Sequence, residues 1–312
     1  MMGTAARRVF LGFAAVFFLS LCSQPPGLAA APEGLEGIFE AELQGSRLQL
    51  NLQIGRSTQG RQLPVRAFHA RPDGVVELRR EAGVFLLSGL DLKARGRQRG
   101  EVVFVPDAAY LAGLEARGLG EPSAELSLSL ATCDVTLAFL DGLLELGYSE
   151  PLSRYLEMRI HDVDARYVRQ LEAAGLARPP AGRLIAMAIH GVDGRYLEAL
   201  GATGFTTLKP SVLSPQRLVA MRIHGVEAAW VSDLAELGYR DLPARRLVEM
   251  RIHGVDPPWL RGLAGLGYRN LEPEQIVALR IHGVDAEWIE GLGESGADLT
   301  VGQLIERRIH GR

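Results

Sequence analysis

The sequence predicts an α+β fold, in which a small antiparallel β domain precedes an α-helical solenoid built from seven two-helix repeats. Residues 32 to about 106 alternate apolar and polar side chains, as half-buried strands do. From Asp107 onward the apolar period changes from 2 to 3.6, and similar segments return about every 29 residues. We therefore expect a signal peptide over residues 1–30, the β domain over residues 31–106 and the repeat array over residues 107–312.

The first thirty residues are typical of an export signal. Two arginines precede a mostly apolar run from Val9 to Cys22, and small residues then allow cleavage near Ala30. The apolar run is short for a membrane span, so an uncleaved anchor or a buried helix is the less favoured alternative. A lipoprotein attached through Cys22 ranks below simple cleavage, because Leu21 stands where a small residue is needed. The expected location is periplasmic or secreted, with no membrane span after cleavage.

Six short strands are expected in the β domain. They are separated by turn signals such as Gly45-Ser46 and Pro72-Asp73-Gly74. The strands are predicted over residues 37–43, 47–54, 63–70, 75–81, 83–89 and 100–106. Because such a sheet has a small core, we expect it to pack against the first repeat.

An aromatic residue and a glycine mark every repeat, with the glycine eight residues after the aromatic. The step between copies is 28 or 29 residues except for one step of 34, which indicates an insertion around residues 206–211. The aromatic residues are Tyr110, Phe139, Tyr167, Tyr196, Trp230, Trp259 and Trp288. The glycines are Gly118, Gly147, Gly175, Gly204, Gly238, Gly267 and Gly296. These are the residues that we expect to build the repeated structure.

One repeat shows why two helices are expected in each. Asp256 is a good N-cap, Pro257 suits the first helical position, and Gly267 suits a left-handed helix end. Pro273 then starts a second helix, whose apolar residues, Ile281 among them, are expected to face inward. The repeats are expected to begin at Asp107, Thr136, Asp164, Asp193, Glu227, Asp256 and Asp285. Stacked helix pairs of this kind bury a shared apolar face, which is how solenoids are stabilised.

Six of the seven histidines occupy one repeat position. They are His161, His190, His224, His253, His282 and His310, and we treat this open-side column as the candidate binding residues. The alternative is that each histidine only ends a helix, where imidazole interacts well with the last carbonyl groups. We favour the helix-end interpretation and expect no bound metal, since single histidines on successive helices lie too far apart to share one ion.

A column of arginines adjoins the histidines, at residues 159, 222, 251, 280 and 308, and is interrupted by Ala188. A helical wheel places Arg222 and Ile223 on the apolar side and His224 on the open side. We expect an internal ladder of ion pairs with the acidic residues that begin the repeats. The alternative is a basic groove for an acidic ligand.

The sequence offers no catalytic motif. It has no His-Glu-x-x-His pair, no Gly-x-Ser-x-Gly turn and no glycine-rich phosphate loop. Cys133 would be the only cysteine after cleavage and is expected to be a small buried residue. A formal net charge of −3 gives no basic field for nucleic acid. We expect a protein that is not an enzyme and that carries no cofactor.

The β segment followed by units such as LVAMRIHGVEAAWVSDLAELGY resembles a known region. It is similar to the repeat-bearing extracytoplasmic region of bacterial homologues in the beta-lactam-sensing metallopeptidase family, and to stand-alone exported repeat proteins. The resemblance covers about residues 32 to 312 and implies an interaction role outside the cytoplasm. The sensors' membrane helices and peptidase motif are absent from this sequence, and Cys133 replaces the usual histidine of the first repeat.

These features predict an exported, non-enzymatic module that binds a protein or a peptide, in a sensing or scaffolding role in the cell envelope. Solenoids present a long continuous surface, which suits such partners. The alternative is a protein that binds a metal ion or a small ligand through the histidine column.

Overall fold

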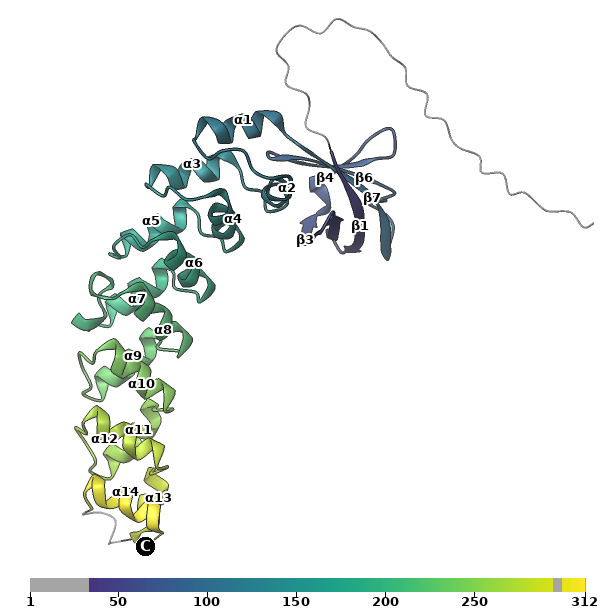
Figure 1. The fold of residues 1–312 in the computed structure, drawn as a ribbon. Coiled ribbons are helices and arrows are strands. Elements are labelled where there is room, and N and C mark those ends of the chain that lie inside the picture. Colours follow the sequence, from purple (N-terminus) through teal and green to yellow (C-terminus); the bar gives the residue numbers. More distant parts are fainter. Residues whose placement is uncertain (1–33, 294–298, 312) are drawn as a thin grey trace, which may run out of the picture. The chain divides into compact units, whose positions relative to one another are not determined.

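The computed structural model describes residues 34–293 and 299–311. The predicted signal segment over residues 1–30, with Cys22, lies outside the described residues, and so does Gly296. The described chain has an α+β architecture, with one antiparallel sheet followed by a series of short helices (Figure 1).

The sheet has seven strands, where the sequence predicted six. They are β1 (Leu35–Gln44), β2 (Arg47–Ile54), β3 (Ser57–Pro64), β4 (Phe68–Ala70), β5 (Val76–Arg80), β6 (Gly83–Ser88) and β7 (Arg97–Pro106). All neighbouring pairs are antiparallel, in the order β3-β2-β1-β7-β6-β5-β4. The predicted strand over residues 63–70 is wrong, because a 3-10 turn at Val65–Ala67 separates β3 from β4.

Strand β3 was missed because of its composition. Its sequence STQGRQLP lacks the apolar alternation that marks a half-buried strand, although it pairs with β2 along its whole length. Strand β3 lies at an edge of the sheet, where polar and charged side chains are tolerated. The inner strands follow the expected pattern, with Leu48, Leu50, Leu52 and Ile54 buried in β2.

The helices begin and end at regular places in the sequence. They are α1 (Ala108–Ala116), α2 (Ala124–Thr132), α3 (Leu137–Glu145), α4 (Leu152–Ile160), α5 (Ala165–Ala173), α6 (Ala181–Ile189), α7 (Gly194–Ala202), α8 (Pro215–Ile223), α9 (Ala228–Glu236), α10 (Ala244–Ile252), α11 (Pro257–Gly265), α12 (Pro273–Ile281), α13 (Ala286–Gly291) and α14 (Val301–His310). Two 3-10 turns, Thr206–Leu208 and Pro210–Val212, occupy the predicted insertion before α8.

Local sequence signals explain the ends of the odd-numbered helices. The residues expected to begin the repeats are their N-caps, and six of the seven accept a hydrogen bond from the backbone N–H three residues later. Glu227 is the N-cap whose side chain makes no such bond. Each described glycine of the repeated set has a positive φ, as Gly267 does at 95°. A left-handed residue of this kind ends a helix and favours glycine.

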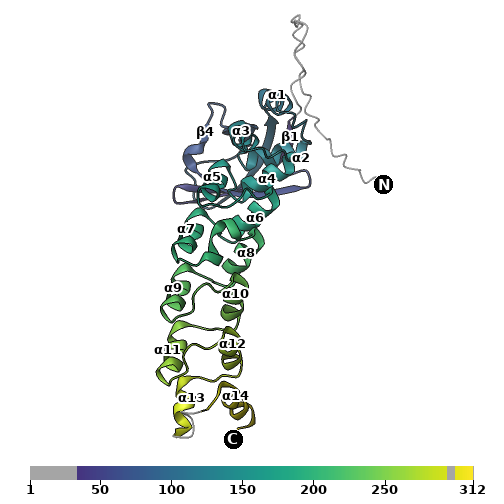
Figure 2. The ribbon, with the colours of Figure 1, turned by 90° about the vertical axis from the view of Figure 1, so that its left-hand side faces the viewer.

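Helices two apart in the sequence contact each other. Contacts join α3 to α5, α5 to α7 and so on to α13, and likewise α2 to α4, α4 to α6 and so on to α14. In Figure 2 the odd-numbered helices from α5 to α13 follow one another beside the even-numbered helices from α6 to α14. Each series therefore presents one row of equivalent helix positions.

Helix α2 packs against the sheet, as expected for the first helical pair. It contacts β3, β6 and β7, and Gln59 Nε2 on β3 donates to Ser129 Oγ at 2.8 Å. Arg61 Nη2 lies 2.7 Å from Cys133 Sγ, so this cysteine is held half-buried at the end of α2. Thr132 between them is buried, with 9% of its surface exposed.

No single helix in the described ranges is long and apolar enough to cross a membrane. Helices α2 and α3 reach the length and the apolar composition of a membrane span only when they are taken together, and the chain bends by 91° between them.

Candidate functional site

The repeated aromatic residues link the end of one helix pair to the start of the next. The Tyr110 hydroxyl donates to the Val135 carbonyl at 2.8 Å, and the Tyr167 hydroxyl donates to the Val192 carbonyl at 2.7 Å. The indole N–H of Trp259 makes the same bond to Val284 at 3.1 Å. Tyr196 and Trp230 bond in the same way to Val226 and Val255. The polar edge of each of these rings thereby satisfies a backbone carbonyl in the turn that joins two helices.

Each arginine of the repeated column lies over an aromatic ring. Arg222 lies 4.6 Å from the Tyr196 ring centroid, and Arg251 lies 5.2 Å from that of Trp230. Arg159, Arg280 and Arg308 lie over Phe139, Trp259 and Trp288 at 5.7, 5.2 and 5.1 Å. A guanidinium over an aromatic face is attracted by the ring quadrupole.

The glycine after four of the histidines lies next to the following arginine of the column. A Cβ on Gly225 would lie 3.0 Å from Arg251 Nη2, and one on Gly191 would lie 3.2 Å from Arg222 Nη2. Both glycines also have a positive φ. Two separate reasons therefore favour glycine at these positions: the left-handed backbone and the close approach of the guanidinium.

The predicted ladder of ion pairs is only partly present. Arg222 pairs with Glu227 at 2.6 Å, and Arg280 lies 3.6 Å from Asp256. The acidic side chains are mostly engaged as N-caps, as when Asp256 accepts from the Trp259 backbone N–H. Arginine stacking on the rings, rather than pairing with the acids, is the contact that all five positions share.

The histidines lie at the ends of the even-numbered helices. His161, His190, His224, His253 and His282 are the C-caps of α4, α6, α8, α10 and α12, and His310 is the last residue of α14. Four of the six are exposed, and His161 and His282 are half-buried. Within the described ranges, no three histidine, cysteine or acidic side chains come together in a way that could hold a metal ion.

A row of isoleucines lies beside the histidines and is exposed, which corrects the prediction that Ile223 and Ile281 face inward. The row consists of Ile160, Ile189, Ile223, Ile252, Ile281 and Ile309, each 47–56% exposed. On the helical wheel the buried side runs only from Met221 through Leu218 toward Arg222, and Ile223 lies beyond it. We call these six residues the isoleucine row.

The helices that carry the isoleucine row are rich in arginine. Helices α4, α6, α8, α10, α12 and α14 contain eleven arginines and four glutamates. Helices α3, α5, α7, α9, α11 and α13 contain four arginines and eight acidic residues. Taken together, the even-numbered helices are thus basic and the odd-numbered helices acidic, although α5 and α11 each carry more arginines than acids.

On α2 the sheet covers the position that carries the exposed isoleucine on the later even-numbered helices. Ser129, Thr132 and Cys133 stand 28 residues before Glu157, Ile160 and His161. Those three residues of α2 face β3, whereas Ile160 is 47% exposed. The smaller side chains on α2 leave room for the strand, which accounts for a cysteine where the other copies have histidine.

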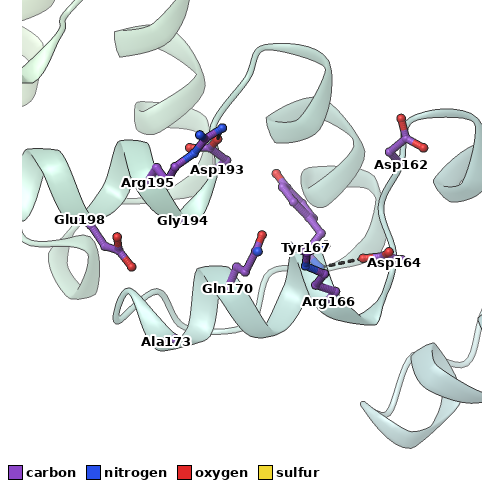
Figure 3. A pocket seen from close by; sticks show the side chains of 10 residues that line it. All are labelled: Asp162, Asp164, Arg166, Tyr167, Gln170, Ala173, Asp193, Gly194, Arg195 and Glu198. Carbon is purple, nitrogen blue, oxygen red and sulfur yellow. Dashed lines mark hydrogen bonds and ion pairs between the residues drawn. The ribbon is translucent and has the colours of Figure 1, made fainter.

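A cavity of about 610 Å³ lies where the repeated arginine is absent. It is lined by Tyr167 and Asp162, and Figure 3 shows the Tyr167 side chain standing between Asp162 on one side and Asp193 with Arg195 on the other. Ala188 is the residue at the arginine position of this copy. Asp162 replaces the usual glycine and keeps its positive φ, at 56°. The sequence showed the interruption at Ala188, but not that it opens a cavity.

The charge around Tyr167 differs from that around Tyr196. Burial raises the pKa of both hydroxyl groups, and the carboxylate of Asp193 raises the pKa of Tyr167 further. At Tyr196, Glu227 also raises the pKa, but the Arg222 guanidinium lowers it. Tyr167 therefore lacks the opposing cation that its counterpart has.

Comparisons with protein-family models, with curated proteins and with solved structures find no match to this chain.

Proposed function

We propose that the helices form a solenoid of seven two-helix repeats, and that the protein is an exported, non-enzymatic module that binds an extended segment of another protein. The recurring Asp N-caps and the ring-to-carbonyl bonds support the solenoid, because they return at equivalent positions along the chain. Contacts between helices two apart support it as well. The N-terminal signal features and the lack of catalytic motifs support export and a binding role.

The isoleucine row is the observation that carries the binding proposal. Burying the exposed half of one isoleucine would contribute about 1 kcal/mol, so six in a row offer a substantial driving force. Regularly spaced exposed apolar side chains among charged residues suit a protein interaction site, because a partner can cover all of them at once. The row also continues the surface that the sheet already covers on α2.

The spacing and the charge of this surface indicate the chemistry of the partner. Packed helices lie roughly 8–10 Å apart, which sets the step between successive isoleucines. An extended polyproline-like chain repeats every three residues, over about 9 Å. The arginine excess of the even-numbered helices favours acidic residues. We therefore expect a segment with an apolar residue at about every third position and acidic residues between them.

A selection from a random peptide library on the purified protein tests the proposal. Selected peptides are expected to carry apolar residues at a step of three with acidic residues between. The double variant Ile223→Ser/Ile252→Ser is expected to bind them at least tenfold more weakly. Val212→Ser is the matched control, because Val212 is apolar and 63% exposed but lies outside the row. Peptides that bind the double variant as well as the unaltered protein would refute the isoleucine row as the binding surface.

Export is tested separately. N-terminal sequencing of the protein from the producing cell is expected to find a chain that begins near Ala31. A protein that still begins at Met1, or that carries a lipid on Cys22, would contradict simple cleavage.

A further inference from the structure

We propose that the cavity between Tyr167 and Asp162 binds a guanidinium group that is supplied by a ligand. This proposal is independent of the isoleucine row, because the cavity is lined by α5, α7 and the turn before α5. It rests on a comparison of equivalent positions within this one chain.

At five other positions the chain itself supplies the guanidinium. Arg159, Arg222, Arg251, Arg280 and Arg308 each lie over an aromatic ring, at 4.6 to 5.7 Å from its centroid. The contact therefore belongs to the packing of these helices and does not depend on one local arrangement. Tyr167 makes the carbonyl bond that Tyr196, Trp230 and Trp259 make, but in the described structure no arginine lies over its ring. Tyr110 in the first copy also lacks an arginine, and the equivalent position there is the buried Ala131.

The preceding copy shows what the arginine occupies. A cavity in the equivalent place is lined by Phe139 and Arg159 and has a volume of about 330 Å³. The cavity beside Tyr167 has a volume of about 610 Å³. The exchange of arginine for Ala188 removes a long side chain from this place, and the larger cavity also extends along α5 and α7 to Ala173 and Glu198.

The charge of the cavity fits a cation. Asp162 stands where later copies have glycine, and the described structure records no hydrogen bond or ion pair for its carboxylate. Asp164 and Asp193 line the same cavity, although each already accepts a bond from the backbone as an N-cap. The carboxylate of Asp162 thus adds a negative charge beside a ring that lacks its usual cation.

The two arginines that line the cavity do not take the vacant place. Arg166 is the residue directly before Tyr167 on α5, and consecutive side chains on a helix do not face each other. Arg195 lies 3.5 Å from Asp193, and its side chain is 92% exposed. Neither lies over the Tyr167 ring in a contact of the kind that the other five arginines make.

A guanidinium suits this place better than an ammonium group. It is planar and can stack on the ring, and its N–H groups can bond to a carboxylate at the same time. The ligand is therefore a molecule that carries an arginine side chain, either as the free amino acid or within a peptide.

Titration of the purified protein, followed by NMR of labelled tyrosine rings, tests the proposal. The Tyr167 signal is identified by its loss in Tyr167→Phe. Nα-acetyl-arginine amide is expected to shift this signal in a saturable way, and the neutral isostere Nα-acetyl-citrulline amide is not. Free arginine and a capped peptide with a central arginine separate the two sources, because tighter binding of one identifies it.

Two variants make the test specific. Ala188→Arg supplies the chain's own guanidinium and is expected to weaken binding at least tenfold. Asp162→Gly removes the carboxylate, restores the residue of the later copies and is expected to weaken binding about fivefold or more. Each variant introduces the residue that other copies have at the same position, so circular dichroism should show an unchanged fold. Equal shifts with citrulline, or unchanged binding in Ala188→Arg, would overturn the proposal.

Discussion

Replacing Trp259 with alanine is expected to lower the free energy of unfolding by about 3–5 kcal/mol. Trp259 is only 9% exposed, and its indole N–H donates to the Val284 carbonyl at 3.1 Å. A buried tryptophan removes on the order of 200 Å² from water, worth about 5 kcal/mol as an upper estimate. The substitution also removes the ring under Arg280 and leaves the Val284 carbonyl without its donor.

Two further variants separate these contributions. Trp259→Phe keeps a ring but loses the N–H, so it is expected to cost about 1–2 kcal/mol. Ile252→Ala is the control for an exposed position, since Ile252 is 55% exposed, and is expected to cost less than about 1 kcal/mol. Urea unfolding followed by circular dichroism measures all three. A loss for Trp259→Ala no larger than that for Ile252→Ala would refute the packing described for the aromatic residues.

Three other outcomes are expected. Gly225→Ala should destabilise the protein by more than about 1 kcal/mol in urea unfolding, because φ of Gly225 is 67° and the new Cβ would lie 3.0 Å from Arg251 Nη2. Gly265→Ala is the control: its new Cβ would meet no other atom within 4 Å, so it should be neutral or stabilising. Burial raises the pKa of Tyr148 to about 12, so the folded state keeps a proton that the unfolded chain loses near pH 10. The contribution of Tyr148 to the free energy of unfolding is complete below about pH 10 and falls by up to about 1.4 kcal/mol per pH unit between pH 10 and pH 12. The free energy of unfolding measured over that range should therefore fall less steeply in Tyr148→Phe. Elemental analysis of the purified protein is expected to find no stoichiometric transition metal, and one zinc, copper or nickel ion per chain would instead support the histidine alternative.

The parts of the fold that follow local rules could be predicted from the sequence. Asp256 and its counterparts are N-caps, and Gly267 ends a helix with a left-handed backbone, as their residue types indicate. Both features depend on a few neighbouring residues, and their repetition strengthens the prediction. The regular strands of the sheet follow from alternation in the same way, as the buried side of β2 shows.

The contacts that sequence reasoning missed join residues that lie far apart. Arg222 was expected to pair with an acid, but it also meets the Tyr196 ring, 26 residues earlier. Ile223 was expected to be buried because the helical wheel placed it on the apolar side. Within the described residues, however, the sheet covers the equivalent position at α2 and Ile223 itself is 55% exposed. Predicting the cavity at Tyr167 would have required Tyr167, Ala188 and Asp162 to be considered together. Its only indication in the sequence was the interruption of the arginine column at Ala188.

The packing of the helices does not account for the repetition of the isoleucines, which are each about half exposed. The buried positions of α4 to α14 are filled by residues such as Met221 and Leu218, and the isoleucine row adds little to that core. If the repeats were alike only because they arose by duplication, all their exposed positions should have kept the same residue to a similar degree. Three residues before each isoleucine, however, the residue is alanine in three copies and glutamate in three, while the isoleucine is the same in all six. Since an exposed apolar residue is otherwise a liability for solubility, a partner that covers the row is the physical reason that we infer for its constancy.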